Sequence, residues 1–245
     1  MAIEKFALEL LSTQTLTPTV KSFTFKRADN QPIVFIAGQF ITLLLLTSTG
    51  ELKRRSYSVA NPPQNTATVE LVISYVKGGV ASEYLFNLKP GEIVEAAGPA
   101  GKLILQQESV KRYILVGTGT GVAPYHAMLP ELSERCQKEG VSVHILQGVQ
   151  YRRDVLYLDA FLRFATTCPN AKFTVHYSRE AQDNAAAYEQ FGYVQNYFTC
   201  LNLNPAQDIV YLCGNPNMID DAFSLLQSLG LSSKQIRREK YISSN

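Results

Sequence analysis

The sequence predicts a two-domain protein: an antiparallel β-barrel over residues 1–105, then an α/β domain with a doubly wound parallel sheet over residues 106–245. Two observations predict this fold class. Before residue 105, short runs rich in Val, Ile, Phe, Tyr and Thr are separated by turn signals, a pattern typical of antiparallel barrels. After residue 112, strand-like runs alternate with helical segments, which indicates βαβ units. The polar segment 106–109 is expected to link the two domains.

The expected elements follow the chain in order. Turn signals such as Asn61-Pro62-Pro63 separate six barrel strands, which cover residues 8–10, 20–26, 40–46, 55–59, 69–75 and 93–97. A short helix over residues 83–88, capped by Ser82, interrupts them, and Gly98-Pro99-Ala100-Gly101 is expected to form a tight turn. In the second domain the expected strands cover residues 112–116, 141–148, 172–177, 209–213 and 236–241, and the expected helices cover residues 125–138, 154–164 and 218–229.

Composition excludes several classes of function. The chain is 46% hydrophobic with a net charge of +2, so its charge favours neither nucleic acid nor a membrane as a partner. Its four cysteines (Cys136, Cys168, Cys200 and Cys213) are far apart, which excludes a zinc knuckle or an iron–sulfur cluster and predicts free thiols; no metal is expected. The N-terminal residues lack the pattern of a signal peptide, so a cytoplasmic location is expected.

The first candidate site is the tetrapeptide Arg55-Ser56-Tyr57-Ser58. On a strand, Arg55 and Tyr57 face one side and the two serines face the other. A guanidinium suits a phosphate, a phenol ring can stack on a flat heterocycle, and a hydroxyl can bond a ring nitrogen. The set therefore suits a flavin nucleotide, although the four residues alone are also compatible with an edge strand that carries a solvated arginine.

A second candidate precedes the short helix. Gly79-Val80-Ala81-Ser82 combines a glycine with small residues at the expected helix start. Backbone N–H groups at a helix start attract anions, so the turn is a candidate phosphate site. The alternative is a plain loop and helix.

The second domain opens on the segment VGTGTGVAP, in which Gly119, Thr120 and Gly121 follow a strand and Pro124 marks the first turn of a helix. Glycines let the backbone approach a pyrophosphate. The spacing is GxGxG rather than GxGxxG, and residues 147–150, at the tip of the next strand, contain no acid for a ribose. A mode of nucleotide binding other than the usual dinucleotide fingerprint is therefore expected.

Later strand ends add further candidates. Ser178 and Arg179 can hold a 2′-phosphate and Tyr193 can stack on adenine, with a solvated loop arginine as the alternative. In the run from Cys213 to Met218, a strand ends and a turn and helix follow, so backbone again points at a ligand. Cys213 is expected on the floor of the ligand crevice at the carboxyl ends of the strands; the alternative is a small buried hydrophobic residue. Glu239-Lys240-Tyr241 lies near the C-terminus.

Together these motifs resemble those of the ferredoxin–NADP reductase family, most closely its short bacterial members, over nearly the whole length. The matching motifs, in chain order, are Arg55 to Ser58, Gly79 to Ser82, Gly98 to Gly101, Gly119 to Pro124, Cys213 to Met218 and Glu239 to Tyr241. The resemblance implies that the barrel binds FAD and the second domain binds NADP, with NAD less favoured. Phe191 stands where some relatives carry a second basic residue, which weakens that preference.

The resemblance also implies roles for single residues. Arg55 and Ser82 would hold FAD phosphate, Tyr57 would stack on the isoalloxazine, and Ser58 would hydrogen-bond near its N5. Thr120 and Cys213 would line the nicotinamide pocket, and Ser178, Arg179 and Tyr193 would take the 2′-phosphate end. Glu239 would relay a proton and Tyr241 would cover the other flavin face. The candidate catalytic residues are Ser58, Cys213 and Glu239, and the candidate cofactor-binding residues are Arg55, Ser56, Tyr57, Ser58, Gly79, Val80, Ala81, Ser82, Gly119, Thr120, Gly121, Ser178, Arg179, Tyr193, Gly214, Asn215, Met218 and Tyr241.

The implied activity is hydride transfer from NADPH to FAD, followed by transfer of single electrons to a separate acidic protein, ferredoxin or flavodoxin. A monomer is expected, with a basic docking rim whose candidates are Lys53, Arg54, Lys77, Arg237 and Arg238. The alternatives are an NAD(P)H-dependent reductase component of an oxygenase, a free-flavin reductase, and a non-catalytic subunit that holds flavin. A hydrolase has little support, because GxSxG, HExxH and P-loop motifs are absent and the three histidines lack patterned partners.

Overall fold

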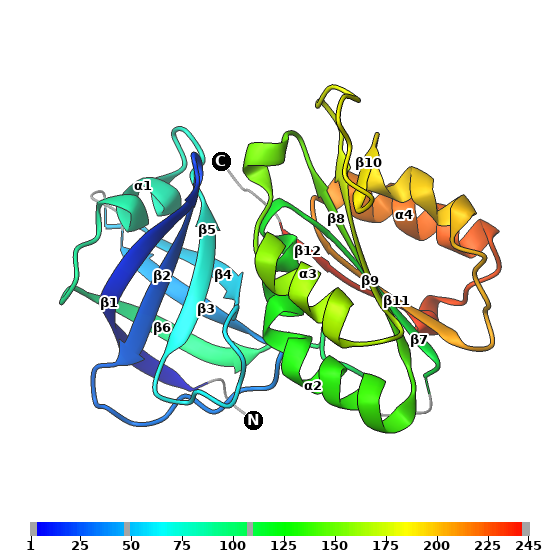
Figure 1. Ribbon diagram of the computed structural model, residues 1–245. Helices are drawn as coiled ribbons and strands as arrows, with labels where there is room; N and C mark the ends of the chain where they lie inside the picture. Colours follow the sequence, from blue (N-terminus) through cyan, green and yellow to red (C-terminus); the bar gives the residue numbers. More distant parts are fainter. Residues whose placement is uncertain (1–3, 47–49, 107–109, 242–245) are drawn as a thin grey trace. The chain divides into compact units, whose positions relative to one another are not determined.

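The computed structural model describes residues 4–46, 50–106 and 110–241 (Figure 1). The chain forms two compact units, which are described separately. Unit 1 consists mainly of Met1–Leu105, joined by Ala123–Met128 from the start of a later helix, and unit 2 contains Gln106–Val122 and Leu129–Ser243. An antiparallel sheet in the first unit and a parallel sheet with helices in the second confirm the expected fold class.

Unit 1 is a curled, six-stranded antiparallel sheet with the strand order β4-β3-β6-β1-β2-β5. Its elements are β1 (Lys5–Thr17), β2 (Val20–Arg27), β3 (Phe40–Leu46), β4 (Leu52–Ser58), β5 (Val69–Ser74), α1 (Val80–Asn87) and β6 (Ile93–Ala100). Val59, one residue beyond β4, bridges Leu71 of β5, so the two ends of the sheet approach each other as in a barrel.

Alternation along the strands decides which side chains enter the core of unit 1. On β3, Ile41, Leu43 and Leu45 are buried among the other core residues, because every second residue points inward. On β4 the same alternation leaves Arg55 and Tyr57 half-buried on one face. That face of an edge strand is where the first candidate site lies.

Three expectations for unit 1 need correction. β1 runs from Lys5 to Thr17 rather than over residues 8–10, because a register shift near Ser12 lets it keep pairing with β2. The expected tight turn at residues 98–101 was wrong, since β6 continues to Ala100 and a register shift against β3 accommodates the extra residue. The short helix begins at Val80, three residues earlier than expected, and its N-cap is Gly79 instead of Ser82.

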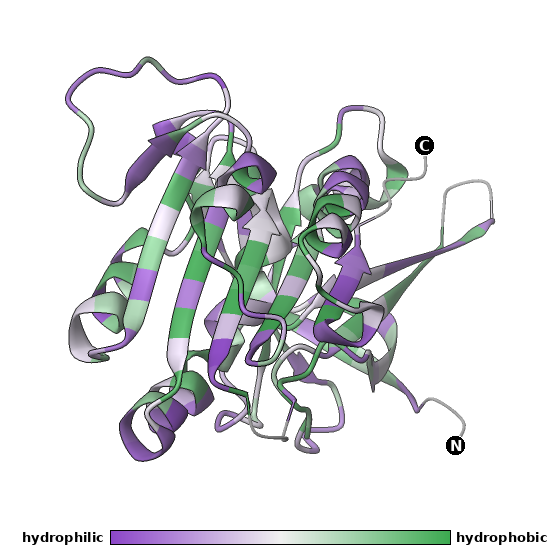
Figure 2. Cartoon of the chain, turned by 90° about the vertical axis from the view of Figure 1, so that its right-hand side faces the viewer, coloured by the Kyte–Doolittle hydropathy of each residue, from purple (hydrophilic) through white to green (hydrophobic). Residues whose placement is uncertain are grey.

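Unit 2 is a six-stranded parallel sheet with the order β10-β9-β8-β7-β11-β12. Its strands are β7 (Arg112–Thr118), β8 (Ser142–Val149), β9 (Ala171–Tyr177), β10 (Glu189–Phe191), β11 (Asp208–Gly214) and β12 (Ile236–Lys240), and its helices are α2 (Ala123–Glu139), α3 (Leu158–Thr167) and α4 (Pro216–Ser228). Short 3-10 turns cover Gly119–Val122, Arg152–Asp154, Val194–Cys200 and Ser233–Gln235. Figure 2 shows hydrophobic residues concentrated along these strands.

Both faces of this sheet are covered, as in a doubly wound fold. One face packs Ile114, Val116 and Leu212 against α4 and the 3-10 turn Val194–Cys200. On the other face α3 lies against β9, where the rings of Phe161 and Phe173 stack 5.3 Å apart between centroids (Figure 1). A strand buried on both faces reads as a continuous apolar run, which is why β7 and β11 were recognisable in the sequence.

The strand order locates the expected ligand crevice. β7 has β8 on one side and β11 on the other, so the order of connection reverses between β7 and β11. In open parallel sheets, ligands bind at such a reversal, outside the carboxyl ends of the strands. The glycine turn after β7 and the Cys-Gly-Asn segment that ends β11 both lie at this point.

Unit 2 also departs from expectation. α3 begins at Leu158 rather than at residue 154, because Asp154 closes a separate 3-10 turn by accepting the backbone N–H of Tyr151. β10 was not anticipated, since three residues are too few for a periodic signal. Most of the expected linker, residues 107–109, lies outside the described part of the chain. None of the described helices combines the length and apolar character needed to cross a bilayer.

Candidate active site

The strand β4 places Arg55, Tyr57 and Ser58 together in unit 1. The Tyr57 ring packs against the barrel core, and this burial raises the pKa of its phenol to about 12, so it stays neutral. Arg55 donates from Nη1 to the carbonyl of Arg54 at 2.8 Å, and Ser58 is only 4% exposed. Ser56 lies on the opposite, exposed face, where its hydroxyl is 2.9 Å from that of Thr42. The strand therefore presents a cation and an aromatic ring side by side.

The turn before α1 is organised by Ser82 itself. Its buried Oγ accepts the backbone N–H of Val76 at 3.0 Å and lies within donating distance of the carbonyls of Val76 and Gly79. The hydroxyl thus holds the turn in shape. The backbone N–H groups of Val80, Ala81 and Ser82 lie in the first turn of α1, where a helix offers them no acceptor. These amides, rather than the Ser82 side chain, are the groups that suit a phosphate.

Close packing accounts for two glycines, Gly121 after β7 and Gly214 at the end of β11, whose predicted contact with cofactor stays a prediction. A Cβ on Gly121 would stand 2.6 Å from the carbonyl carbon of Cys213 and 2.9 Å from Cα of Gly214. Gly214 itself has φ +117°, and a Cβ there would stand 2.7 Å from the carbonyl oxygen of Thr118. The turn after β7 therefore rests directly on the end of β11.

Gly119 is different, because a Cβ at this position would meet nothing within 4 Å. Its φ of +53° explains the glycine, and the open space beside it allows a ligand to approach the backbone. Thr120 follows it and is half-exposed. This open part of a glycine turn fits a nucleotide phosphate.

Thr118 is a residue that the sequence interpretation missed. Its Oγ1 accepts the backbone N–H of Asn215 at 2.9 Å and ties the end of β7 to the loop after β11. Asn215 in turn caps α4, because its Oδ1 accepts from the backbone N–H groups of Asn217 and Met218. Met218, in the first turn of α4, is buried in the core of unit 2, and its predicted contact with cofactor stays a prediction.

Cys213, Glu239 and Tyr241 come together at one place. Cys213 and Glu239 are paired in the register of β11 and β12, and the amide of Tyr241 donates to the carbonyl of Gly214 at 2.8 Å. Burial raises the pKa of the Cys213 thiol, and the neighbouring Glu239 carboxylate raises it further. A hydrogen bond from the Tyr241 side chain opposes these effects. The thiol is therefore neutral, and the expectation that Tyr241 covers a flavin stays a prediction.

The candidates for the adenosine end follow β9 and β10, and the first two are held by backbone just beyond β8. The amides of Ser178 and Arg179 donate to the carbonyls of Val149 and Gln150, each at 3.0 Å. Tyr193 is 65% exposed and follows Gly192, whose amide donates to Tyr177 at 2.9 Å. Pairing of β9 with β10 thus brings Ser178, Arg179 and Tyr193 to one edge of unit 2.

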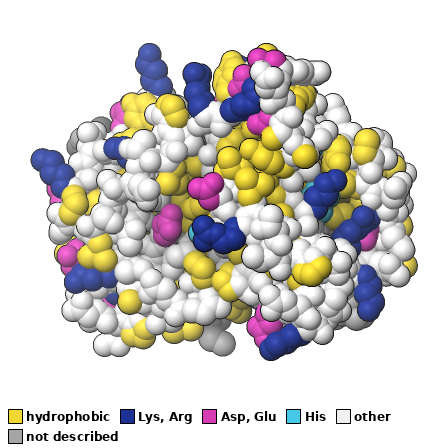
Figure 3. Space-filling model, in the orientation of Figure 1, with side chains coloured by type: hydrophobic (Ala, Val, Ile, Leu, Met, Phe, Trp, Pro, Cys, Tyr) yellow, Lys and Arg dark blue, Asp and Glu magenta, His cyan; other side chains and the backbone are white. Residues whose placement is uncertain are grey.

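Three residues of the expected basic docking rim already have partners within the protein. Lys53 pairs with Glu51 at 2.5 Å, Arg237 donates to Gln106 at 3.0 Å, and Arg238 lies 4.0 Å above the Phe223 ring. On the face drawn in Figure 3, Lys and Arg side chains occur in separate groups with acidic side chains among them. The rim therefore stays a prediction.

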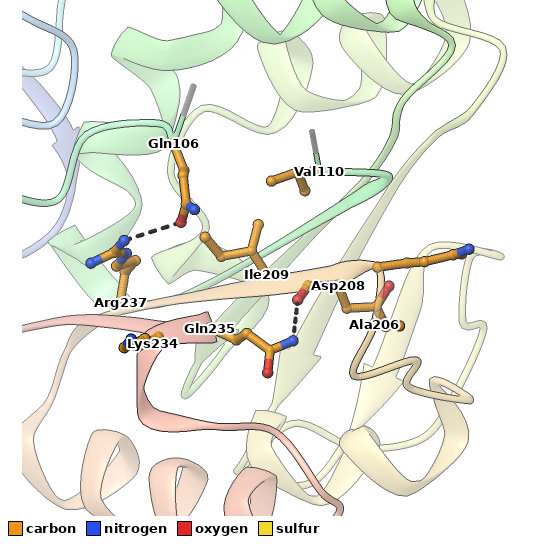
Figure 4. A pocket seen from close by; sticks show the side chains of 9 residues that line it. Gln106, Val110, Ala206, Asp208, Ile209, Lys234, Gln235 and Arg237 are labelled. Atoms are coloured by element: carbon orange, nitrogen blue, oxygen red, sulfur yellow. Dashed lines mark hydrogen bonds between the residues drawn. The ribbon is translucent and has the colours of Figure 1, made fainter. Parts of the chain in front are cut away.

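A pocket of about 620 Å³ lies at the amino ends of the parallel strands, where β11 and β12 begin (Figure 4). It is lined by Gln106, Val110, Ala206, Gln207, Asp208, Ile209, Lys234, Gln235 and Arg237. None of the candidate site residues is among them. This pocket is therefore separate from the crevice at the carboxyl ends of the strands.

Comparison with known proteins matches both units. An oxidoreductase FAD-binding domain covers residues 7–104, and an oxidoreductase NAD-binding domain covers residues 115–223. Ferredoxin–NADP reductase B of Sorangium cellulosum is 31% identical over 97% of this chain and 98% of its own length. The toluate 1,2-dioxygenase electron transfer component of Pseudomonas putida is 30% identical over 94% of this chain, which spans only 65% of that protein. Among solved structures, the cytochrome P450 reductase GcoB of Amycolatopsis has a TM-score of 0.85 at 26% identity, covering 99% of this chain and 71% of that one.

The geometry and the comparisons agree on the cofactors. Unit 1 offers a ring, a cation and helix amides that fit FAD, and unit 2 offers an open glycine turn and an exposed arginine that fit a nicotinamide dinucleotide. The chain therefore belongs to the ferredoxin–NADP reductase family and is an FAD-dependent oxidoreductase.

Proposed function

We propose that this protein is an NADPH-dependent ferredoxin reductase that acts as a monomer, with flavodoxin as a second acceptor. The face of β4 on which Arg55 and the half-buried Tyr57 ring lie beside buried Ser58 carries the proposal. The relative from S. cellulosum, which this chain matches over 98% of its length, supports ferredoxin as the acceptor. When bound, FAD supplies the conversion of a two-electron hydride donor into single electrons.

In unit 1, Arg55 and the first-turn amides of α1 would hold the FAD phosphates, and Tyr57 would lie against the flavin ring. Tyr57 is a neutral partner for the ring, because burial raises the pKa of its phenol to about 12. Ser58 is almost fully buried at the end of β4 and would place its hydroxyl at the ring edge while it excludes water.

In unit 2, Thr120 and the open backbone at Gly119 would hold the dinucleotide, with Ser178, Arg179 and Tyr193 at its adenosine end. Cys213 would shape the floor of the nicotinamide pocket as a neutral thiol, because burial raises its pKa. Glu239, paired with Cys213 across the strands, is the residue that we propose holds a mobile proton at its carboxylate.

A second candidate function is the reductase component of an oxygenase. The similarity to the toluate dioxygenase electron transfer component favours it, although this chain spans only 65% of that relative. Both functions use the same residues, so the preferred acceptor decides between them.

The proposal is tested with purified, FAD-loaded protein. NADPH should bleach the flavin band at about 450 nm, and kcat/KM should be higher for ferredoxin than for free FMN or an oxygenase component. A colourless protein that gains no band with added FAD would contradict the proposal. A yellow protein that prefers free FMN or the oxygenase would support the alternatives.

A variant tests the role of Ser58. Ser58→Val should slow flavin reduction about 100-fold, the usual effect of displacing reacting groups by about 1 Å, while FAD affinity changes little. Ser22→Val is the matched control, because Ser22 is a similarly buried serine on β2 of the same barrel. If stopped-flow reduction of the Ser58 variant kept the rate of the control, Ser58 would not lie at the reacting atoms.

A further inference from the structure

The carboxyl ends of β8 and β9 lie side by side. The amide of Ser178 donates to the carbonyl of Val149, and the amide of Arg179 donates to the carbonyl of Gln150. The two segments that follow these strands therefore start next to each other. The first of these segments contains two consecutive arginines, Arg152 and Arg153. The structure gives the two arginines different surroundings.

Arg152 is fully engaged within the protein. Its Nε and Nη2 donate to the two carboxylate oxygens of Glu189 at 3.0 and 3.2 Å, and Nη2 also donates to the carbonyl of Asp183 at 2.9 Å. The guanidinium lies 5.6 Å from the ring centroid of Tyr177 and 6.0 Å from that of Phe191. Arg152 therefore fastens the segment between β9 and β10 to the end of β8, and its charge is already paired.

Arg153 is exposed, and its guanidinium lies 4.9 Å from the ring centroid of Tyr151. The acidic side chains of these segments have other partners: Asp154 accepts the amide of Tyr151 at 3.1 Å, Glu180 accepts the amide of Arg152 at 2.9 Å, and Asp183 lies 3.5 Å from Nη1 of Arg152. Among the described residues no carboxylate forms an ion pair with Arg153 or Arg179. The segments after β8 and β9 therefore carry two exposed guanidinium groups, those of Arg153 and Arg179, that are available to bind an anion.

We propose that Arg153 is a specificity-determining residue that, with Arg179, selects an adenosine 2′-phosphate over an adenosine with a free 2′-hydroxyl. The inference rests on the proposed use of NADPH. A phosphate ester carries more than one negative charge near neutral pH, and a guanidinium can donate two parallel hydrogen bonds to it. The Tyr151 ring supports the Arg153 guanidinium by a cation–π contact, which reduces the ordering required when the phosphate binds.

The test is calorimetric titration of the FAD-loaded protein with 2′,5′-ADP and with 5′-AMP. Arg153→Gln and Arg179→Gln should each weaken 2′,5′-ADP binding by about tenfold or more and leave 5′-AMP binding unchanged. Arg163→Gln is the matched control, because Arg163 is an exposed arginine on α3 of the same unit and its loss removes the same charge. Arg152→Gln should weaken both ligands alike, because it releases the segment that carries the site.

Two results would overturn the inference: unchanged 2′,5′-ADP binding in the Arg153 variant, or an equal loss for both ligands, which would mean a structural role. The ratio of kcat/KM for NADPH over NADH should fall in parallel with the 2′,5′-ADP affinity. Failure of the proposed function looks different, since the flavin band would then be absent or would bleach with neither nucleotide.

Discussion

Replacing Gly121 with alanine would force a methyl group between two backbone segments of unit 2. The new Cβ would stand 2.6 Å from the carbonyl carbon of Cys213, whereas ordinary contacts begin at 3.4 Å. The carbonyl oxygen of Cys213 would lie closer still, so the end of β11 and the turn after β7 must separate by more than about 0.8 Å, and neither can yield as a flexible side chain would. Overpacking of this kind costs about 1–3 kcal/mol of the free energy of unfolding.

Urea unfolding followed by circular dichroism measures this cost, and thermal unfolding should show a fall in Tm of about 2–4 °C for each kcal/mol. Gly119→Asn is the control for stability, because this position has φ +53° but open space, and asparagine tolerates that backbone conformation. The control should cost about 1 kcal/mol, the lower end of the cost of a left-handed residue, because asparagine adopts this conformation more readily than most residues. A Gly121→Ala variant as stable as the wild type would refute the argument that this glycine exists to bring the two segments into contact.

The remaining predictions concern two buried histidines and the four cysteines of unit 2. Burial lowers the pKa of His144 to about 3 and that of His176 to about 4, below the unfolded value of 6.5. The unfolded chain therefore binds protons first, and the free energy of unfolding should fall between pH 6.5 and about 4, by up to about 1.4 kcal/mol per pH unit for each histidine. Urea unfolding at a series of pH values checks this, and His176→Gln should flatten the dependence; a profile that is level below pH 6.5 would contradict it. Among the cysteines, Cys200 is exposed and Cys136, Cys168 and Cys213 are buried. A thiol reagent such as DTNB should therefore label one cysteine in the folded protein and four after denaturation, and Cys200→Ser should abolish the fast reaction; rapid labelling in that variant would show that a buried thiol is accessible.

Local sequence signals predicted the elements with strong periodicity. The bounds expected for β3 agree with the structure, and those for β2 and β5 differ by one residue at one end, because alternating or continuous apolar residues specify burial directly. The face of β4 shared by Arg55 and Tyr57 follows from the same alternation. Signals that depend on a single capping or turn residue were less reliable. The sequence predicts that Ser82 caps a helix, yet its hydroxyl accepts the amide of Val76, six residues earlier in the chain.

By itself, the sequence determined the fold class, the order of the motifs and the position of the candidate site at the ends of β7, β9 and β11. These properties depend on patterns within ten or twenty residues, which the chain carries locally. Only the tertiary structure decided how individual residues are used. Gly121 meets Cys213 and Arg152 meets Glu189 across separate strands, and Arg153 has no carboxylate partner among the described residues. Free space and unused hydrogen-bonding groups depend on neighbours that are distant in the chain. Arg152 and Arg153 therefore look equivalent in the sequence, and only the fold brings Glu189 to Arg152 and not to Arg153.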